Sequence, residues 1–148
     1  ISNLKSEEYG YVPLKQKNVD TGMGVERTVA VLNGRRSVFD VEPLKVIVEK
    51  VRELAKNKDT RAERIITDHL RAATFILGDE KGIAPSNVEQ GYVLRRLIRR
   101  AIRYGKKLGI EKSFTHEISK LVIELMSGEY PELNKNKDFI IEQLAQEE

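Results

Sequence analysis

Residues 91–109 contain a segment in which pairs of apolar residues alternate with pairs of arginines. At about 100° per residue, the apolar residues share one face of a helix and the arginines gather on the other. This pattern predicts an amphipathic helix whose apolar face joins a core and whose basic face meets an anionic partner or solvent. The apolar positions are Val93, Leu94, Leu97, Ile98, Ala101 and Ile102, and the basic ones are Arg95, Arg96, Arg99, Arg100 and Arg103.

The positive charge of the chain is concentrated in this segment. Lys106 and Lys107 raise its formal charge to +7 without an acidic residue, although the whole chain of 148 residues carries only +3. Like charges four residues apart repel each other, and no acid on the same helix offsets this repulsion. Two explanations stay open. The arginines pair with acids from elsewhere in the fold, or they bind nucleic-acid phosphates, whose oxygens match the arginine fork.

Composition restricts the classes of site that the chain can carry. Without cysteine it has no disulfide, no thiolate metal site and no cysteine nucleophile. His69 and His116 lack the spacing of metal ligands, so we expect ordinary helix residues and no bound metal. No apolar run approaches the ~18 residues of a membrane span, and no signal peptide is evident, so we expect a cytoplasmic protein. The start at Ile1 and the stop at Glu148 suggest a piece of a larger protein.

Hydrophobic periodicity predicts a mainly helical chain with a short β-rich start. Aromatic and β-branched residues around a turn signal near Gly10, and again at Lys17–Asp20, predict short strands that form a hairpin. A helix is expected from the glycines at 22 and 24 to Asn33, and another over 43–56 with Pro43 in its first turn. Further helices are expected over 60–77, through the arginine segment, over 114–125 and around 139–144. Thr60-x-x-Glu63 and Ser86-x-x-Glu89 are candidate capping boxes.

A second motif, Asp20-Thr21-Gly22-Met23-Gly24-Val25-Glu26-Arg27, precedes the first helix. Glycines allow a backbone to approach a ligand closely, and an arginine at the start of a helix could hold a phosphate with help from the helix N-terminus. The isolated pattern is weakly specific and is also typical of a turn.

Three segments together resemble the alanyl-tRNA synthetases, a family of class II aminoacyl-tRNA synthetases. Residues 19–27 resemble the third class II motif of that family, a strand-to-helix unit that closes the ATP site. Residues 66–75 resemble the next helix, and Pro85-Ser86-Asn87 with residues 91–96 resembles the segment that contacts the tRNA acceptor stem. The resemblance extends from about residue 12 to residue 105, and the order of the three segments makes it more specific than any one of them.

The resemblance implies substrate contacts at the first motif. Asp20 matches the carboxylate that binds the ammonium group of alanine. Gly22 and Gly24 match positions beneath the alanine and the adenine of ATP, where a side chain would collide. Arg27 matches the catalytic arginine at the ATP triphosphate, which stabilises charge during formation of the adenylate.

It also implies tRNA contacts around the arginine helix. Asn87 matches the asparagine that recognises the third base pair of the acceptor stem, a G·U wobble, and the arginines after it would position the phosphates. Each residue has a structural alternative: a turn for Asp20, a helix N-cap for Asn87, and an internal ion pair for Arg95 or Arg99. The residues implied to bind phosphates are Arg95, Arg96, Arg99, Arg100 and Arg103.

The resemblance divides the chain into the end of a catalytic domain (1–34) and an incomplete helical middle domain that recognises tRNA (35–148). The parent would attach alanine to its tRNA with ATP and Mg²⁺. The first two class II motifs and the metal cluster of the editing domain are missing here, so this chain is expected to be inactive alone and to bind no cofactor tightly. Val88-Glu89-Gln90 departs from the expected bacterial pattern and favours an archaeal-type relative. The alternatives are a helical interaction module whose basic helix binds an acidic partner, and a freestanding nucleotide-binding protein.

Overall fold

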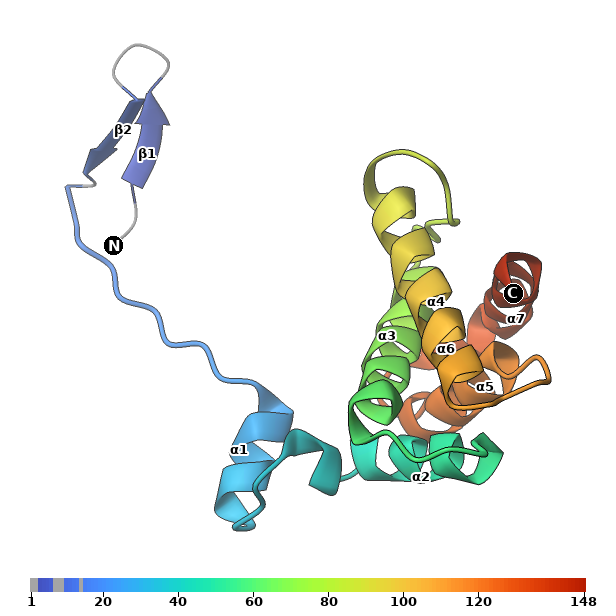
Figure 1. Cartoon of the computed structure of the whole chain (residues 1–148). Coiled ribbons are helices and arrows are strands. Elements are labelled where there is room, and N and C mark those ends of the chain that lie inside the picture. Colours follow the sequence, from blue (N-terminus) through green and yellow to red (C-terminus); the bar gives the residue numbers. More distant parts are fainter. Residues whose placement is uncertain (1–2, 7–9, 14) are drawn as a thin grey trace.

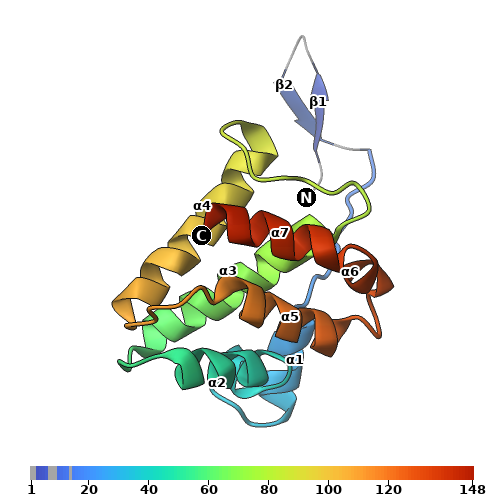
Figure 2. The ribbon, with the colours of Figure 1, turned by 90° about the vertical axis from the view of Figure 1, so that its right-hand side faces the viewer.

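Two helices of 19 residues each, α3 (Thr60–Gly78) and α4 (Glu89–Lys107), form the centre of the structure. The computed structural model describes residues 3–6, 10–13 and 15–148 of the chain. Figure 1 shows α3 and α4 side by side, joined at one end by the loop of residues 79–88. Helices α2 (Leu44–Leu54), α5 (Thr115–Met126), α6 (Pro131–Lys135) and α7 (Lys137–Glu147) all contact α3. Figure 2 shows α5 and α7 lying across the α3–α4 pair.

The core of this bundle begins at α2 and extends to α7. Its members lie on the faces that the 3.6-residue period predicts, and burial of each large aliphatic side chain contributes about 1.5–3 kcal/mol. The predicted mainly helical fold is therefore confirmed. None of the described helices is long and apolar enough to span a bilayer. The largest fully buried side chains are Ile47, Val51, Ile66, Leu70, Leu77, Leu94, Ile98, Leu108, Ile118, Leu133, Ile140 and Leu144.

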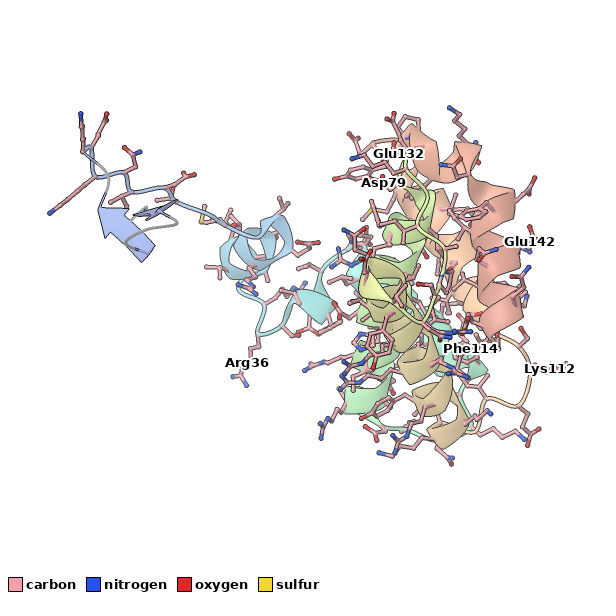
Figure 3. The ribbon with its side chains drawn as sticks, turned by 90° about the horizontal axis from the view of Figure 1, so that it is seen from above. Arg36, Asp79, Lys112, Phe114, Glu132 and Glu142 are labelled. Atoms are coloured by element: carbon pink, nitrogen blue, oxygen red, sulfur yellow. The ribbon has the colours of Figure 1, made fainter. Side chains whose placement is uncertain are left out.

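Helix α1 (Val25–Leu32) lies beside the bundle and joins it through few contacts. Glu26 accepts a hydrogen bond of 2.9 Å from Nη1 of Arg71 on α3. A 3-10 helix, η1 (Val38–Asp40), connects α1 to α2, and Arg36 before it points away from the bundle (Figure 3). Most apolar side chains of α1 face solvent: Val31 is 76% exposed and Leu32 is 80% exposed. The α1 surface therefore contributes little to the core.

Two short strands, β1 (Asn3–Ser6) and β2 (Gly10–Pro13), pair antiparallel, with Leu4 opposite Val12. Figure 1 shows them apart from the helices, beyond an extended segment. Gly10 begins β2, and residues 7–9, where the predicted turn near Gly10 would fall, lie outside the described residues, as does Leu14. The strand predicted at Lys17–Asp20 is wrong, since this segment has no strand partner among the described residues.

The start of α3 differs from the predicted capping box. Asp59 is the N-cap, and its Oδ1 accepts a hydrogen bond of 3.0 Å from the backbone N–H of Ala62. Thr60 is already the first helical residue. Glu63 is buried and forms an ion pair of 2.8 Å with Nε of Arg52 on α2, so it does not cap the helix. A carboxylate at the N-terminus of a helix is favourable because it faces the positive end of the helix dipole.

Asp59 also links the two central helices and makes stability dependent on pH. The hydrogen bond that Lys107 donates to Asp59 lowers the pKa of that carboxyl below its ordinary value of 3.8, and the Ala62 N–H adds to this effect. A lowered folded-state pKa stabilises the fold above the unfolded pKa, and this contribution is lost as pH falls through the folded pKa. Asp59→Asn keeps a capping oxygen but removes the charge. We expect its stability to fall less than that of the wild type between about pH 6 and pH 3, measured by urea unfolding. An identical decline would contradict this assignment.

Candidate nucleic-acid interface on helix α4

The inner face of α4 fixes the rotation of the helix about its axis. Leu94, Ile98 and Ala101 are fully buried in the core. Near the C-terminal end, a Cβ at Gly105 would come within 2.4 Å of the Phe114 ring, so the helix and this ring are in very close contact. With this face buried, the basic residues of α4 must lie on the outer side, as the sequence predicted.

The loop of residues 84–88 packs tightly on the first turn of α4. The backbone N–H of Ser86 donates to the carbonyl of Gly91 at 3.1 Å, and the Ser86 hydroxyl donates to the carbonyl of Val88 at 2.9 Å. A Cβ at Gly91 would lie 2.3 Å from Ser86 Oγ and 2.7 Å from the carbonyl oxygen of Ala84. Only glycine allows this approach. The loop that carries Asn87 is therefore held against the helix.

The second predicted capping box is wrong. Val88 is the N-cap of α4, and its side chain offers no hydrogen bond. Ser86 bonds within its own loop, and Glu89 has a φ of 49°, in the left-handed region. The sequence pattern suggested a cap because Ser and Glu have the right spacing, but the contact with Gly91 draws Ser86 away from the helix start.

The structure divides the basic side of α4 into two edges. On the edge toward α7, Arg95 Nε lies 2.9 Å from a carboxylate oxygen of Glu147, and Arg99 Nε lies 3.8 Å from the other. On the edge toward α3, Arg100 lies 5.9 Å from the ring centre of Tyr104, a cation–π distance. Arg96 similarly lies 5.8 Å from the ring centre of Tyr92.

Internal ion pairing accounts for only part of this basic side. Arg95 and Arg99 share Glu147, and Lys107 pairs with Asp59 at 2.6 Å. The alternative of an internally paired helix face thus holds for these three residues. The remaining cations of α4 are exposed to solvent. Within residues 15–148, no carboxylate lies within 4.0 Å of their side-chain nitrogens. These unpaired cations are Arg96, Arg100, Arg103 and Lys106.

Asn87 lies exposed at the N-terminal end of the basic side and contacts Arg95. Its Oδ1 accepts a hydrogen bond from Nη1 of Arg95. The predicted alternative, an N-cap, is not what the structure shows, because Val88 occupies that position. The structure thus brings together two of the residues that the sequence singled out.

A basic groove beside Arg100 was missed at the level of sequence. Arg61 and Arg64 project from α3 next to Arg100, and Arg64 lies 5.2 Å from the ring centre of Phe39. Asp68 is the acid of this groove, and the hydrogen bond from His69 lowers its pKa. The signal was present as two arginines on the exposed face of the 60–77 helix. These two arginines are separated by acidic and apolar residues, so they do not form a dense basic segment like that of α4.

The first motif lies elsewhere on the molecule. Asp20, Gly22 and Gly24 are exposed in the extended segment before α1, and Arg27 is exposed in the first turn of that helix. Neither glycine has a positive φ, and a Cβ at Gly22 would meet no atom of the described residues within 4 Å. Figure 1 shows α1 and α4 at separate places, so the described residues do not combine the two motifs into one site.

Comparison with known proteins identifies the family of the chain. A family model described as tRNA synthetases class II (A) matches residues 2–148. The chain belongs to this family. Among its relatives, alanine–tRNA ligase of Borreliella afzelii is 47% identical over 150 residues, which cover 97% of this chain and 25% of the relative.

Other relatives of this class II synthetase chain have the same name. Alanine–tRNA ligase of Treponema pallidum is 46% identical, with 97% of this chain and 25% of the relative covered. The corresponding enzyme of Anaeromyxobacter is 42% identical, with 94% and 16% covered. The chain thus spans a quarter or less of the length of these relatives. The resemblance to the alanyl-tRNA synthetases is confirmed, whereas these relatives are bacterial and give no support to an archaeal type.

Proposed function

We propose that this chain is the part of an alanine–tRNA ligase that joins the catalytic domain to the tRNA-recognising domain. Residues 1–34 would be the end of the catalytic domain, with the β1–β2 pair and the segment before α1 as a remnant of its antiparallel sheet. Residues 35–148 would begin the recognition domain. The parent enzyme would attach alanine to its tRNA with ATP and Mg²⁺ in the cytoplasm, and this chain alone would not activate alanine.

The observation that carries the tRNA assignment is the set of cations on α4 that pair with no carboxylate among the described residues. Arg96, Arg100 and Arg103 are exposed, and Arg61 and Arg64 extend the positive surface onto α3. Guanidinium groups bind phosphate oxygens through paired hydrogen bonds, and such contacts position a nucleic acid without identifying its sequence. Asn87 at one end of this surface would supply the base contact, because an exposed amide can hydrogen-bond to base edges in the RNA minor groove.

The surface of α1 supports the catalytic-domain assignment. Met23 is 81% exposed and Val25 is 74% exposed. At the other end of the helix, Val31 and Leu32 are exposed as well. Adjacent exposed apolar side chains are typical of an interface with another domain. No contact among the described residues requires glycine at Gly22, so its lack of a side chain would leave room for a substrate or a neighbouring strand.

Part of the ATP assignment fits the residues present. Gly24 is the N-cap of α1 and leaves the first N–H groups of the helix without a side-chain partner, and Arg27 lies in the same turn. A helix N-terminus with an arginine suits a triphosphate, and Asp20 has the charge to pair with the ammonium group of alanine. Among the described residues, no cluster of three acidic or histidine side chains could hold a metal ion, so we assign no Mg²⁺ ligand to this chain.

Asn87→Ala tests the proposed function most directly. The change removes the base contact but leaves the phosphate contacts of α4. We expect the preference of the chain for an acceptor-stem duplex with G·U at the third pair, over one with G·C, to fall by about 5- to 10-fold. Fluorescence anisotropy with the two duplexes measures this ratio, and Asn134→Ala, an exposed asparagine on α6, is the control.

The same titrations distinguish the other functional classes. A module for acidic protein partners would bind both duplexes and random RNA alike, with or without Asn87. A freestanding nucleotide-binding protein would bind ATP in isolation with an affinity that Arg27→Ala reduces. An unchanged G·U preference in Asn87→Ala would remove this residue from the recognition site.

A further inference from the structure

Helix α7 holds one arginine of α4 in a fixed position. Nε of Arg95 lies 2.9 and 3.0 Å from the two carboxylate oxygens of Glu147. The Glu147 side chain is 10% exposed and that of Arg95 is 30% exposed, whereas Arg99 is 69% exposed and lies farther away. Charge-assisted hydrogen bonds in a partly buried setting are among the stronger polar contacts in proteins. Arg95 is thus the one arginine of this edge with little freedom to reach outward.

The far end of the Arg95 guanidinium contacts Asn87. Its Nη1 donates to Oδ1 of Asn87. An arginine has only donors, so the atom of the amide that faces it must be the oxygen, whichever way the amide is drawn. The Asn87 NH₂ group is then the part of the amide that is left for an external ligand. Glu147, Arg95 and Asn87 form a continuous chain from α7 through α4 to the loop.

We propose that Arg95, held by Glu147, is a positioning residue that orients the amide of Asn87 toward RNA. The inference rests on the proposed role of Asn87 in recognising a base pair. Because the amide oxygen is used internally, Asn87 presents its donors, which match the acceptor atoms of bases in the minor groove. Arg95 therefore differs from Arg96, Arg100 and Arg103, which lack acidic partners among the described residues and are suited to phosphates.

The two roles predict different responses to salt. Loss of a phosphate contact lowers the salt dependence of RNA binding by about one unit in the log–log slope, and loss of a positioning contact does not. Glu147→Gln weakens the hold on Arg95 without removing any cation of α4. We expect the G·U preference of the chain to fall by about 3- to 10-fold in this variant with an unchanged slope. Arg103→Gln should show the reverse, with a smaller slope and the full preference.

Two further variants test whether the effect passes through Asn87. In the double variant Asn87→Ala with Glu147→Gln, the preference should be no lower than in Asn87→Ala alone, because both changes act on the same contact. Glu142→Gln, on the outer side of α7 (Figure 3), is the matched control and should change neither quantity. All measurements are made below the onset of thermal unfolding of each variant, followed by circular dichroism.

A spectroscopic readout separates the failure of this inference from the failure of the proposed function. The side-chain NH₂ resonances of Asn87, assigned by their loss in Asn87→Ala, should shift in Glu147→Gln and in Arg95→Lys, but not in Glu142→Gln. If they do not shift, or if Glu147→Gln keeps the full G·U preference while Asn87→Ala loses it, Arg95 does not position Asn87. If they shift but Asn87→Ala keeps the preference, the contact is present and Asn87 does not recognise the base pair, which overturns the functional role proposed for Arg95.

Discussion

Ile98→Ala is expected to lower the free energy of unfolding by about 2–5 kcal/mol, the range for large aliphatic side chains in well-packed cores. Ile98 is fully buried in the middle of α4, in the core that this helix shares with α3. Truncation removes apolar contact and leaves a cavity, because 19-residue helices anchored at both ends cannot move together to fill it. Most small domains have only about 5–15 kcal/mol of total stability, so this single change removes a large part of it.

Urea unfolding followed by circular dichroism measures the change in free energy. Val93→Ala is the matched control, since Val93 lies on the same helix with 55% of its surface exposed. Surface substitutions of this kind alter stability by about 0.5 kcal/mol or less. Equal effects of the two substitutions would mean that the inner face of α4 is not packed as described.

Gly91→Ala is expected to destabilise the chain by about 1–3 kcal/mol and to remove most of the G·U preference together with it. Replacing glycine by alanine in an exposed helix normally raises the free energy of unfolding by about 1 kcal/mol. A decrease at this position therefore indicates the close contact between Gly91 and the loop. The added Cβ would come within 2.7 Å of the Ala84 carbonyl oxygen, which belongs to the backbone and cannot rotate away. The loop of residues 84–88 must therefore move, and Asn87 moves with it.

The stability and the RNA preference of Gly91→Ala are measured on the same sample. Gly128→Ala is the control, because a Cβ there would meet no described atom within 4 Å and its φ is not positive. A Gly91→Ala chain that is more stable than the wild type, with the G·U preference retained, would show that the loop does not depend on this close contact.

The longer helices could be predicted because each has an apolar face with helical spacing. The ends were harder to predict, since Asp59 and Thr60 are both good caps by type and only the structure shows that Asp59 accepts the hydrogen bond. Helix α6 was missed because five residues are too few to show a period, although Pro131 at its first turn was a signal. The requirement for glycine at position 91 depends on the loop atoms that pack against it, and a single sequence does not reveal such a contact.

The candidate site could also be predicted only in part from the sequence. The density of arginines in 91–109 predicted a basic surface, and the described part of the chain has one. Which arginines pair internally could not be predicted, because Glu147 lies 52 residues from Arg95 in the sequence and reaches it only when α7 packs beside α4. The roles of Asp20, Gly22, Gly24 and Arg27 remain predictions, since they rest on the resemblance and not on contacts among the described residues.

The buried side chains of the bundle come from one continuous part of the chain. The main cluster of buried side chains begins at Ile47 and ends at Leu144, and no residue of α1 belongs to it. A break in the coding sequence between the codons of Gly34 and Ser37 would leave every member of that cluster on one side. The helical bundle could thus be inherited, duplicated or joined to a different upstream domain as a unit, with the Glu26–Arg71 pair among the few interactions to be re-established.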